Sequence, residues 1–334
     1  MQHYNALMKA ILCRKLGPPE TLTFEDIPPP NMGPADVRIN VHAAGVNFPD
    51  LLIIEGKYQF RPEMPFSPGA EVSGDVLETG SQVTRVRKGD RVIGISRWNG
   101  FAEEVVVPEE RCLQMPPNMT YQVGAGFPMT YGTSYHALVQ RGQLRPGETL
   151  LVHGASGGVG TAALDIGRNL GASLIATGGD DKKLQVVATK YGLRHTVNYH
   201  TNPLWKDEVK ALTGGRGADV IYDPVGGSVL EQSLRCINWN GRVLVVGFAS
   251  GSIPKIPANL VLLKGCQVVG VFWGAFLTRT PSDNLQNFQT LFDWFEADRL
   301  NPIVSKTLPL SRACDALDLL RDRTIVGKVV LTMR

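Results

Sequence analysis

The stretch that decides the fold reads Thr149-Leu150-Leu151-Val152-His153-Gly154-Ala155-Ser156-Gly157-Gly158-Val159-Gly160, and it continues through residues 161–171. Its start, Leu150 to Val152, is a short apolar run after Pro146-Gly147, which is typical of a buried strand. Beyond the glycines, apolar residues recur at helical spacing up to Gly171, a residue type that often ends helices. The stretch therefore predicts a strand, a glycine-rich turn and a helix.

Three interpretations of this turn are open. In the first, Ala155, Gly157 and Gly160 form an A-x-G-x-x-G motif, whose backbone N–H groups and positive helix end can approach a pyrophosphate. In the second, the turn binds no ligand. In the third, residues 154–158 match the G-x-S-x-G elbow of a hydrolase, with Ser156 as nucleophile. That fold needs a histidine late in the chain, and here the last histidine is His200.

The residues after the turn favour a dinucleotide. The apolar segment 172–177 predicts a second strand, which completes the strand–helix–strand unit of a mononucleotide-binding half. Where an NAD site has an acidic residue, this strand ends in Gly178-Gly179, followed by Asp180-Asp181-Lys182-Lys183. The missing carboxylate and the lysines favour the 2′-phosphate of NADPH. Asp180 or Asp181 could instead bend back to a ribose, which would favour NADH.

At this point the chain resembles the zinc-independent quinone oxidoreductase (zeta-crystallin-like) branch of the medium-chain dehydrogenase/reductase superfamily. The segments that carry the resemblance are Ala44-Gly45-Val46-Asn47 with Asp50, Tyr131-Gly132-Thr133, Ala155 to Gly160, Val197-Asn198-Tyr199, Asp223-Pro224-Val225-Gly226-Gly227 and Gly327-Lys328-Val329-Val330. The resemblance covers nearly the whole chain from Met8 onward.

The resemblance implies an α/β fold with two domains. A GroES-like β-barrel catalytic domain is expected over residues 1–128, where Val37, Ile39 and Val41 alternate with polar residues as in a half-buried strand. A Rossmann domain with a doubly wound parallel sheet is expected over residues 129–276, and residues 277–334 should return to the first domain. The apolar run from Val268 to Trp273 is expected to be the strand that lines the nicotinamide and pairs across a homodimer.

Metal chemistry is predicted to be absent. Zinc alcohol dehydrogenases of the superfamily use a cysteine at the position of Asn47 and the histidine of a Gly-His-Glu motif, which here reads Gly69-Ala70-Glu71. The region of the third ligand, residues 127–129, has no cysteine. Zinc needs thiolate, imidazole or carboxylate ligands in close array. Without a Lewis acid we expect acceptors that are already electrophilic, such as quinones.

The resemblance also assigns site residues. Asn47, Asp50 and Tyr58 match positions near the substrate and the nicotinamide, although a structural hydrogen bond is an equally good interpretation of Asp50. The residues expected to bind NADP(H) are Asn47, Thr133, Ser156, Gly157, Gly158, Val159, Gly178, Lys183, Tyr199, Gly247, Phe248, Phe272, Trp273 and Arg323. Among them Lys183, Tyr199 and Arg323 match the family's 2′-phosphate cage. A helix cap is the alternative for Thr133.

The composition limits the remaining possibilities. The 334 residues are 43% hydrophobic and carry a net charge of +3, too little to predict binding to nucleic acid or to a membrane surface. The five cysteines form no C-x-x-C pair, and the first residues show no leader pattern, so a cytoplasmic location is expected. Residues 1–7 are expected to be a loose extension.

The sequence predicts an NADPH-dependent reductase of quinones, by hydride or one-electron transfer. A 2-alkenal or enoyl (enone) reductase is the alternative within the same chemistry. Non-catalytic alternatives are an NADPH-binding crystallin-like protein, an RNA-binding protein or a redox sensor.

Overall fold

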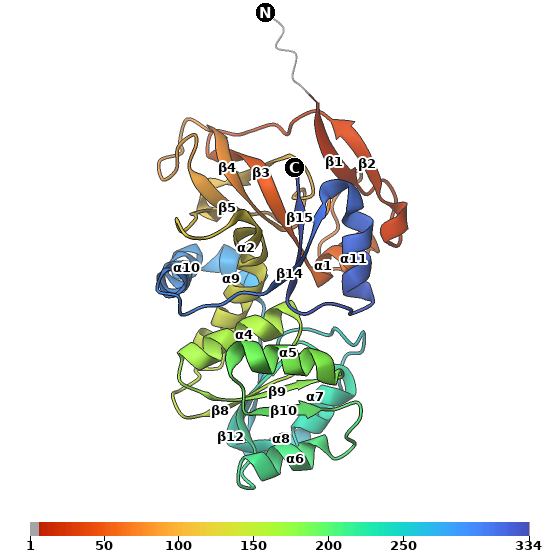
Figure 1. Ribbon diagram of the computed structural model, residues 1–334, viewed down its shortest axis with the longest axis vertical. Helices are drawn as coiled ribbons and strands as arrows, with labels where there is room; N and C mark the ends of the chain where they lie inside the picture. The colour runs from red at the N-terminus through yellow and green to blue at the C-terminus, as the bar shows by residue number, and fades with distance from the viewer. Residues whose placement is uncertain (1–6, 334) are drawn as a thin grey trace, which may run out of the picture. The chain divides into compact units, whose positions relative to one another are not determined.

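The computed structural model describes residues 7–333, and the chain divides into two compact units. Unit 1 comprises the described parts of Met1–Met129 and Val304–Arg334, and unit 2 comprises Thr130–Ile303. Figure 1 labels their elements. The extension expected at residues 1–7 lies outside the described residues, except for Leu7.

Unit 1 is built mainly of antiparallel strands, as expected of a GroES-like domain. Its strands are β1 (Met8–Leu12), β2 (Thr23–Ile27), β3 (Asp36–Val46), β4 (Glu71–Thr79), β5 (Arg91–Ile95), β6 (Glu104–Pro108), β7 (Cys112–Gln114), β14 (Val304–Pro309) and β15 (Lys328–Thr332), and its helices are α1 (Phe48–Ile54), α2 (Tyr121–Gly126) and α11 (Ala313–Arg321). The main sheet has the order β14-β15-β3-β4-β5-β7, and β6 pairs with β3. Strand β15 thus joins the C-terminal segment to β3, with Val330 opposite Gly45.

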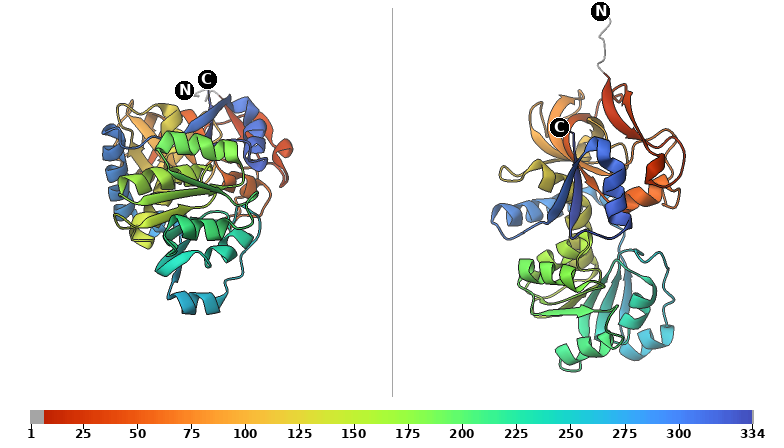
Figure 2. Two further views of the ribbon diagram at one scale, coloured as in Figure 1. Left: turned by 60° about the horizontal axis from the view of Figure 1, so that its bottom comes forward. Right: turned by 45° about the vertical axis from the view of Figure 1, so that its right-hand side comes forward.

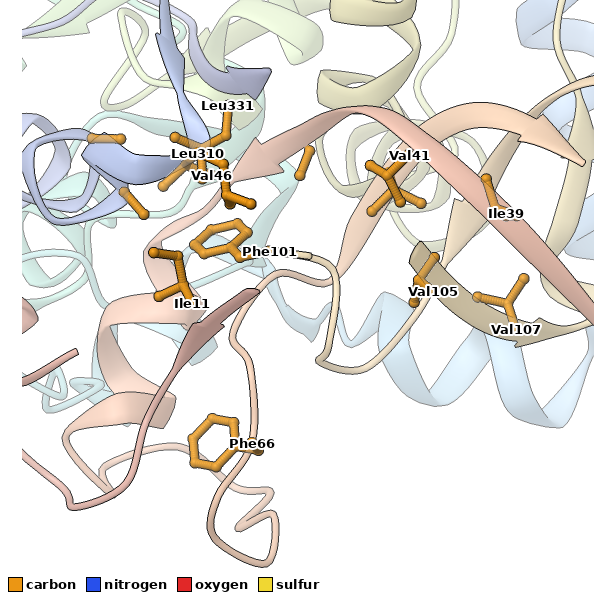
Figure 3. Packing of buried hydrophobic residues seen from close by; sticks show 14 of the residues in the cluster. Ile11, Ile39, Val41, Val46, Phe66, Phe101, Val105, Val107, Leu310 and Leu331 are labelled. Atoms are coloured by element: carbon orange, nitrogen blue, oxygen red, sulfur yellow. The ribbon is translucent and has the colours of Figure 1, made fainter. Parts of the chain in front are cut away.

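The core of unit 1 follows from the alternation along β3. Val37, Ile39 and Val41 are buried. Figure 3 shows Ile39 and Val41 beside Val105 and Val107 of β6. Each side chain of this size stabilises the fold by about 1.5–3 kcal/mol when fully buried. The same cluster includes Leu331 of β15, so the C-terminal strand shares the core of the N-terminal segment.

Unit 2 is a doubly wound parallel sheet. Its strands are β8 (Thr149–Val152), β9 (Ser173–Gly178), β10 (His195–Asn198), β11 (Ala218–Asp223), β12 (Ile237–Val245) and β13 (Gln267–Gly270), and its helices are α3 (Thr133–Tyr135), α4 (Gly158–Asn169), α5 (Asp181–Tyr191), α6 (Trp205–Leu212), α7 (Gly227–Ser233), α8 (Ala258–Lys264), α9 (Trp273–Arg279) and α10 (Pro281–Glu296). The strand order is β10-β9-β8-β11-β12-β13. In Figure 2 the green helices α4 and α5 lie on one face of this sheet. This is the order of a dinucleotide-binding fold, whose switch point lies between β8 and β11.

Two expectations need correction in unit 2. The return to unit 1 was expected at residue 277, but α10 belongs to unit 2 and the return begins at Val304. The reason is packing within unit 2, because the indole Nε1 of Trp273 donates to Asn284 and its ring packs edge-on against Phe288. The strand expected from Val268 to Trp273 is shorter. It ends at Gly270, and Trp273 starts helix α9.

Candidate functional sites in the two units

The glycine-rich turn of unit 2 joins β8 to α4. Gly154 has a φ of +55°, which favours glycine, and Gly157 is the N-cap of α4 with no side chain to satisfy the first N–H groups. A β-carbon at Gly160 would overlap the backbone at Gly154 and Ala155, whereas one at Gly157 would meet only the Gly154 carbonyl oxygen at 3.4 Å. Gly160 is therefore needed for the turn itself, and Gly157 leaves space at the helix end.

A buried histidine, His153, directly precedes the turn and hydrogen-bonds to two neighbouring elements. The Nδ1 of His153 lies 2.6 Å from the Thr177 hydroxyl, and its Nε2 lies 2.8 Å from the Ser233 hydroxyl. Burial lowers the pKa of His153 to about 3, so the ring is neutral at pH 7. This network joins the ends of β8 and β9 to α7. His153 is engaged on both ring nitrogens and does not serve Ser156 as a base, which argues against the hydrolase interpretation.

The end of β9 carries no acidic side chain, and its two glycines are closely packed against neighbouring side chains. A β-carbon at Gly178 would lie 3.2 Å from a methyl group of Leu184, and one at Gly179 would overlap the imidazole of His200. The two nearby acids have partners of their own. Asp180 accepts the Lys183 N–H at 3.0 Å and caps α5, and Asp181 accepts the side-chain amide of Asn198 at 3.0 Å.

The structure brings two of the three expected cage residues to this place. Tyr199 donates its N–H to the carbonyl of Gly178 at 3.1 Å, and Lys183 lies in the first turn of α5. Arg323 lies in unit 1, on an exposed turn after α11 with a φ of +53°. Its share in a cage with Lys183 and Tyr199 stays a prediction.

The other residues expected at the nucleotide lie in unit 2 as follows. Gly247 and Phe248 form the turn after β12, where the N–H of Gly247 donates to the Asp223 carbonyl, and the Phe248 side chain is exposed. Phe272 is also exposed, whereas Trp273 is buried. The indole of Trp273 is thus part of the core of unit 2.

Thr133 lies inside a continuous helical stretch rather than at its start. Its preceding residue, Gly132, already has helical φ and ψ angles, so Thr133 is not a helix cap. A β-carbon at Gly132 would lie 2.8 Å from the indole of Trp273. This glycine of the Tyr131-Gly132-Thr133 motif therefore makes room for a core tryptophan.

In unit 1, Asn47 and Asp50 meet at the start of α1. The N–H of Asn47 donates to one carboxyl oxygen of Asp50 at 2.8 Å, and the N–H of Gly69 donates to the other at 3.0 Å. Asp50 is buried, and this burial raises the pKa of its carboxyl to about 7 against the opposing effect of these donors. Asp50 thus has the structural role that the sequence left open, and its carboxyl titrates near neutral pH.

Tyr58 lies on the loop that follows α1, with its ring centroid 5.8 Å from that of Phe60. Burial, and secondarily the nearby charge of Asp50, raise the pKa of the Tyr58 phenol. The phenol is therefore protonated at pH 7 and is able to donate a proton. The guanidinium of Arg97 lies over the ring of Phe60, at 5.5 Å from the ring centroid.

A buried lysine completes this region of unit 1. The ammonium of Lys328 donates to the Val46 carbonyl at 2.8 Å, to Asn47 Oδ1 at 2.7 Å and to Glu71 Oε1 at 2.8 Å. The second carboxyl oxygen of Glu71 accepts the N–H of Met129 at 2.8 Å. Asn47 Nδ2 donates to Glu71 at 2.9 Å and to the Gly45 carbonyl at 3.3 Å.

This arrangement does not fit zinc. Of the positions that hold the ligands in zinc relatives, Asn47 here contacts Glu71 and Lys328, and Met129 donates its N–H to Glu71. A lysine ammonium is a cation that can only donate, and Asn47 offers an amide in place of a thiolate. Within residues 7–333 no group of three His, Cys, Asp or Glu side chains could hold a metal ion.

Sequence reasoning did not identify Lys328, Glu71 or His200 as site residues. Lys328 and Glu71 did stand in the quoted motifs, but their pairing joins segments 257 positions apart. His200 directly follows the Val197-Asn198-Tyr199 motif, and its contact with Gly179 appears only when β9 and β10 pair.

Two further properties bear on the setting of the chain. None of the helices in residues 7–333 is long and apolar enough to cross a membrane. All five cysteines are free thiols, and burial raises the pKa of Cys112 and Cys236 to about 12, so these two thiols are unreactive at neutral pH.

Comparison with known proteins agrees with both units. Residues 33–117 match the alcohol dehydrogenase GroES-like domain, and residues 158–296 match the zinc-binding dehydrogenase family. The chain is 40% identical over 98% of its length to the quinone oxidoreductase-like protein 2 homolog of Nematostella vectensis, of which it covers 89%. It is 32% identical to the quinone oxidoreductase of Sus scrofa, with 98% of both chains covered.

A solved structure of a mycobacterial protein complexed with NADPH superposes with a TM-score of 0.91 at 29% identity, over 97% of this chain and 100% of the other. The chain therefore belongs to the medium-chain dehydrogenase/reductase superfamily, which the fold of both units already indicates. Within this superfamily it belongs to the quinone oxidoreductase branch, and it is an oxidoreductase.

Proposed function

We propose that this protein uses NADPH to reduce quinones or related conjugated carbonyl compounds, without zinc. The observation that carries the choice of cofactor is the end of β9. Gly178 and Gly179 stand where a ribose-binding carboxylate would be, and a β-carbon at either would press on Leu184 or His200. Asp180 caps α5 and Asp181 accepts the Asn198 amide, so each carboxylate already has a partner through one of its oxygens.

The chain's own groups would hold the nucleotide. The open N-terminus of α4 at Gly157 and Gly158 presents backbone N–H groups to the pyrophosphate, with Ser156 and Val159 beside it. Lys183, Tyr199 and Arg323 would bind the 2′-phosphate. The part of the site toward the nicotinamide would be completed by Gly247, Phe248, Phe272, Thr133 and the backbone of Trp273. Bound NADPH supplies a hydride and becomes NADP⁺.

On the acceptor side, unit 1 offers a phenol, that of Tyr58, rather than a Lewis acid. A quinone that accepts a hydride becomes a delocalised hydroquinone anion, which then takes one proton. We propose that Tyr58 donates this proton and regains it from water, since a phenol is protonated at pH 7 and the hydroquinone anion is a base of similar strength. Quinones need little further help, so positioning and exclusion of water supply most of the catalysis.

A panel of acceptors tests this function. We expect steady NADPH consumption with 1,4-benzoquinone and 9,10-phenanthrenequinone, and slower turnover with 2-alkenals and enoyl thioesters. Faster turnover with the enals or thioesters would favour the enone reductase alternative. The Tyr58→Phe variant should keep its NADPH affinity and lose turnover, whereas Tyr121→Phe serves as a control for the loss of a phenol elsewhere in unit 1.

We also propose a cytoplasmic homodimer. Strand β13 is an edge of the unit 2 sheet, and exposed apolar side chains lie on β13 at Val268 and on α8 at Leu262 and Leu263. An exposed edge strand with apolar neighbours is suited to pairing with a second copy. Light scattering should give the mass of a dimer, and Leu262→Asp with Leu263→Asp should give a monomer; an unchanged mass in this variant would argue against this interface.

A further inference from the structure

The ammonium of Lys328 occupies a fully specified position in unit 1. All three of its N–H donors are used, on Val46, Asn47 and Glu71. The Lys328 side chain is 8% exposed and that of Glu71 is fully buried. The ammonium is therefore held in one place and cannot swing out to solvent.

Two glycines make space for this pair. A β-carbon at Gly45 would overlap the carboxylate of Glu71, and one at Gly126 would lie 3.3 Å from the Lys328 side chain. Neither glycine has a positive φ, so backbone conformation does not require them. At Gly45 the close approach of both the Ala125 carbonyl oxygen and the Glu71 carboxylate requires a residue without a side chain, and at Gly126 the aliphatic part of Lys328 packs close.

The pair is an expensive way to stabilise a fold. Removing two charges from water carries a large desolvation penalty, so a well-packed apolar pair of the same volume often stabilises a fold equally well or better. A buried ion pair is therefore weak evidence of a purely stabilising role. The hydrogen bonds of the ion pair instead act on the side chain of Asn47. Asn47 has both amide hydrogens and its carbonyl oxygen engaged by this network, which leaves its side chain a single orientation and only one free lone pair.

The same charges act on Asp50. The charged or titratable groups that influence its carboxyl are Lys328 from β15, Glu71 from β4 and Tyr58 from the loop after α1. Lys328 lowers the pKa of Asp50 and Glu71 raises it, each in addition to the larger effect of burial. The ion pair thus contacts Asn47 at the start of α1 and shifts the pKa of Asp50, whose carboxyl caps this helix.

We infer that Lys328 is the positioning residue of the acceptor site: its ammonium, held by Glu71, fixes the side chain of Asn47 and the start of α1 on which Asp50 lies. The inference rests on the proposed function, because it concerns the acceptor side of the same reaction. Lys328 contacts neither substrate nor cofactor in this role and acts through Asn47 and the α1 cap.

The test compares Lys328→Met, Glu71→Gln and the double variant with wild type, and uses Lys306→Met on exposed β14 as a control. Three quantities are measured: thermal unfolding, the titration of the Asp50 carboxyl by ¹³C NMR, and the pH profile of kcat with 9,10-phenanthrenequinone. Loss of Lys328 should raise the titration midpoint of Asp50, and Glu71→Gln should lower it, each by about one pH unit. The kcat profile should follow these shifts, because the Asp50 carboxylate holds the start of α1 and the backbone of Asn47 through its hydrogen bonds.

The double variant separates function from fold. Lys328→Met leaves a buried carboxylate unpaired and should unfold more easily, whereas the double variant should regain most of this stability. We expect its kcat to stay at least tenfold below wild type. Recovery of kcat together with stability, or midpoint shifts in the same direction for the two single variants, would overturn the inference. Opposite midpoint shifts without any wild-type quinone turnover would support the electrostatic role and reject the proposed function.

Discussion

The imidazole of His200 lies directly against Gly179, so closely that a β-carbon at this glycine would overlap the ring. The Tyr199 and His200 rings are themselves in edge contact, with centroids 5.2 Å apart. The end of β9 thus carries no carboxylate of its own, and Lys183, Tyr199 and His200 lie near it together with the capping Asp180 and with Asp181.

The preference for NADPH should depend on charge at this place. Charge-assisted contacts to a phosphate are worth about 1.5–3 kcal/mol each, or roughly ten- to a hundredfold in affinity. Lys183→Ala with Arg323→Ala should therefore weaken NADPH binding far more than NADH binding, measured by titration calorimetry at constant ionic strength. Lys182→Ala, which removes an exposed neighbouring charge, is the control. Equal losses for the two nucleotides would mean that Lys183 and Arg323 do not bind the 2′-phosphate.

The two glycines of the turn should differ in their effects. Gly157→Val adds a side chain where only the Gly154 carbonyl is near, so the protein should fold normally and lose nucleotide binding. Gly160→Val should instead lower the unfolding temperature, because its side chain meets the turn backbone. Circular dichroism melts and nucleotide titrations distinguish the two. Undiminished NADPH affinity in Gly157→Val would show that the pyrophosphate binds elsewhere.

Ser156 should be dispensable as a nucleophile. His153 is buried and bonded to Thr177 and Ser233, so no neighbouring histidine activates the Ser156 hydroxyl. Ser156→Ala should keep most reductase activity, and the native protein should not hydrolyse p-nitrophenyl esters. Covalent labelling of Ser156 by a fluorophosphonate probe would restore the hydrolase interpretation.

The neutral His153 should make unit 2 acid-sensitive. Its pKa is lowered to about 3 in the fold from 6.5, so the unfolded chain binds its proton first as pH falls. The stability that this residue contributes is complete above pH 6.5 and declines below it, by about 2–3 kcal/mol at pH 4.5. Denaturant unfolding of wild type and His153→Gln between pH 8 and 4.5 measures the effect. Parallel pH curves for the two proteins would show that His153 does not titrate on unfolding.

Much of unit 2 could be predicted from local patterns. The strand before the turn, the helix after it and the end at Gly171, with its φ of +77°, all lie where the sequence places them, because each depends on neighbouring residues. The return at Val304 could not be found in this way, since the apolar stripe of α10 does not indicate which core it joins. The pairing of Lys328 with Glu71 and the contact of His200 with Gly179 depend on long-range strand pairing, which periodicity does not reveal.

The most direct test of the account compares NADPH and NADH oxidation with 9,10-phenanthrenequinone, using protein treated with a chelator and checked for zinc by elemental analysis. We predict full activity with far less than one zinc per chain, and a higher kcat/KM with NADPH than with NADH. A stoichiometric zinc whose removal abolishes turnover, or a preference for NADH, would contradict the account.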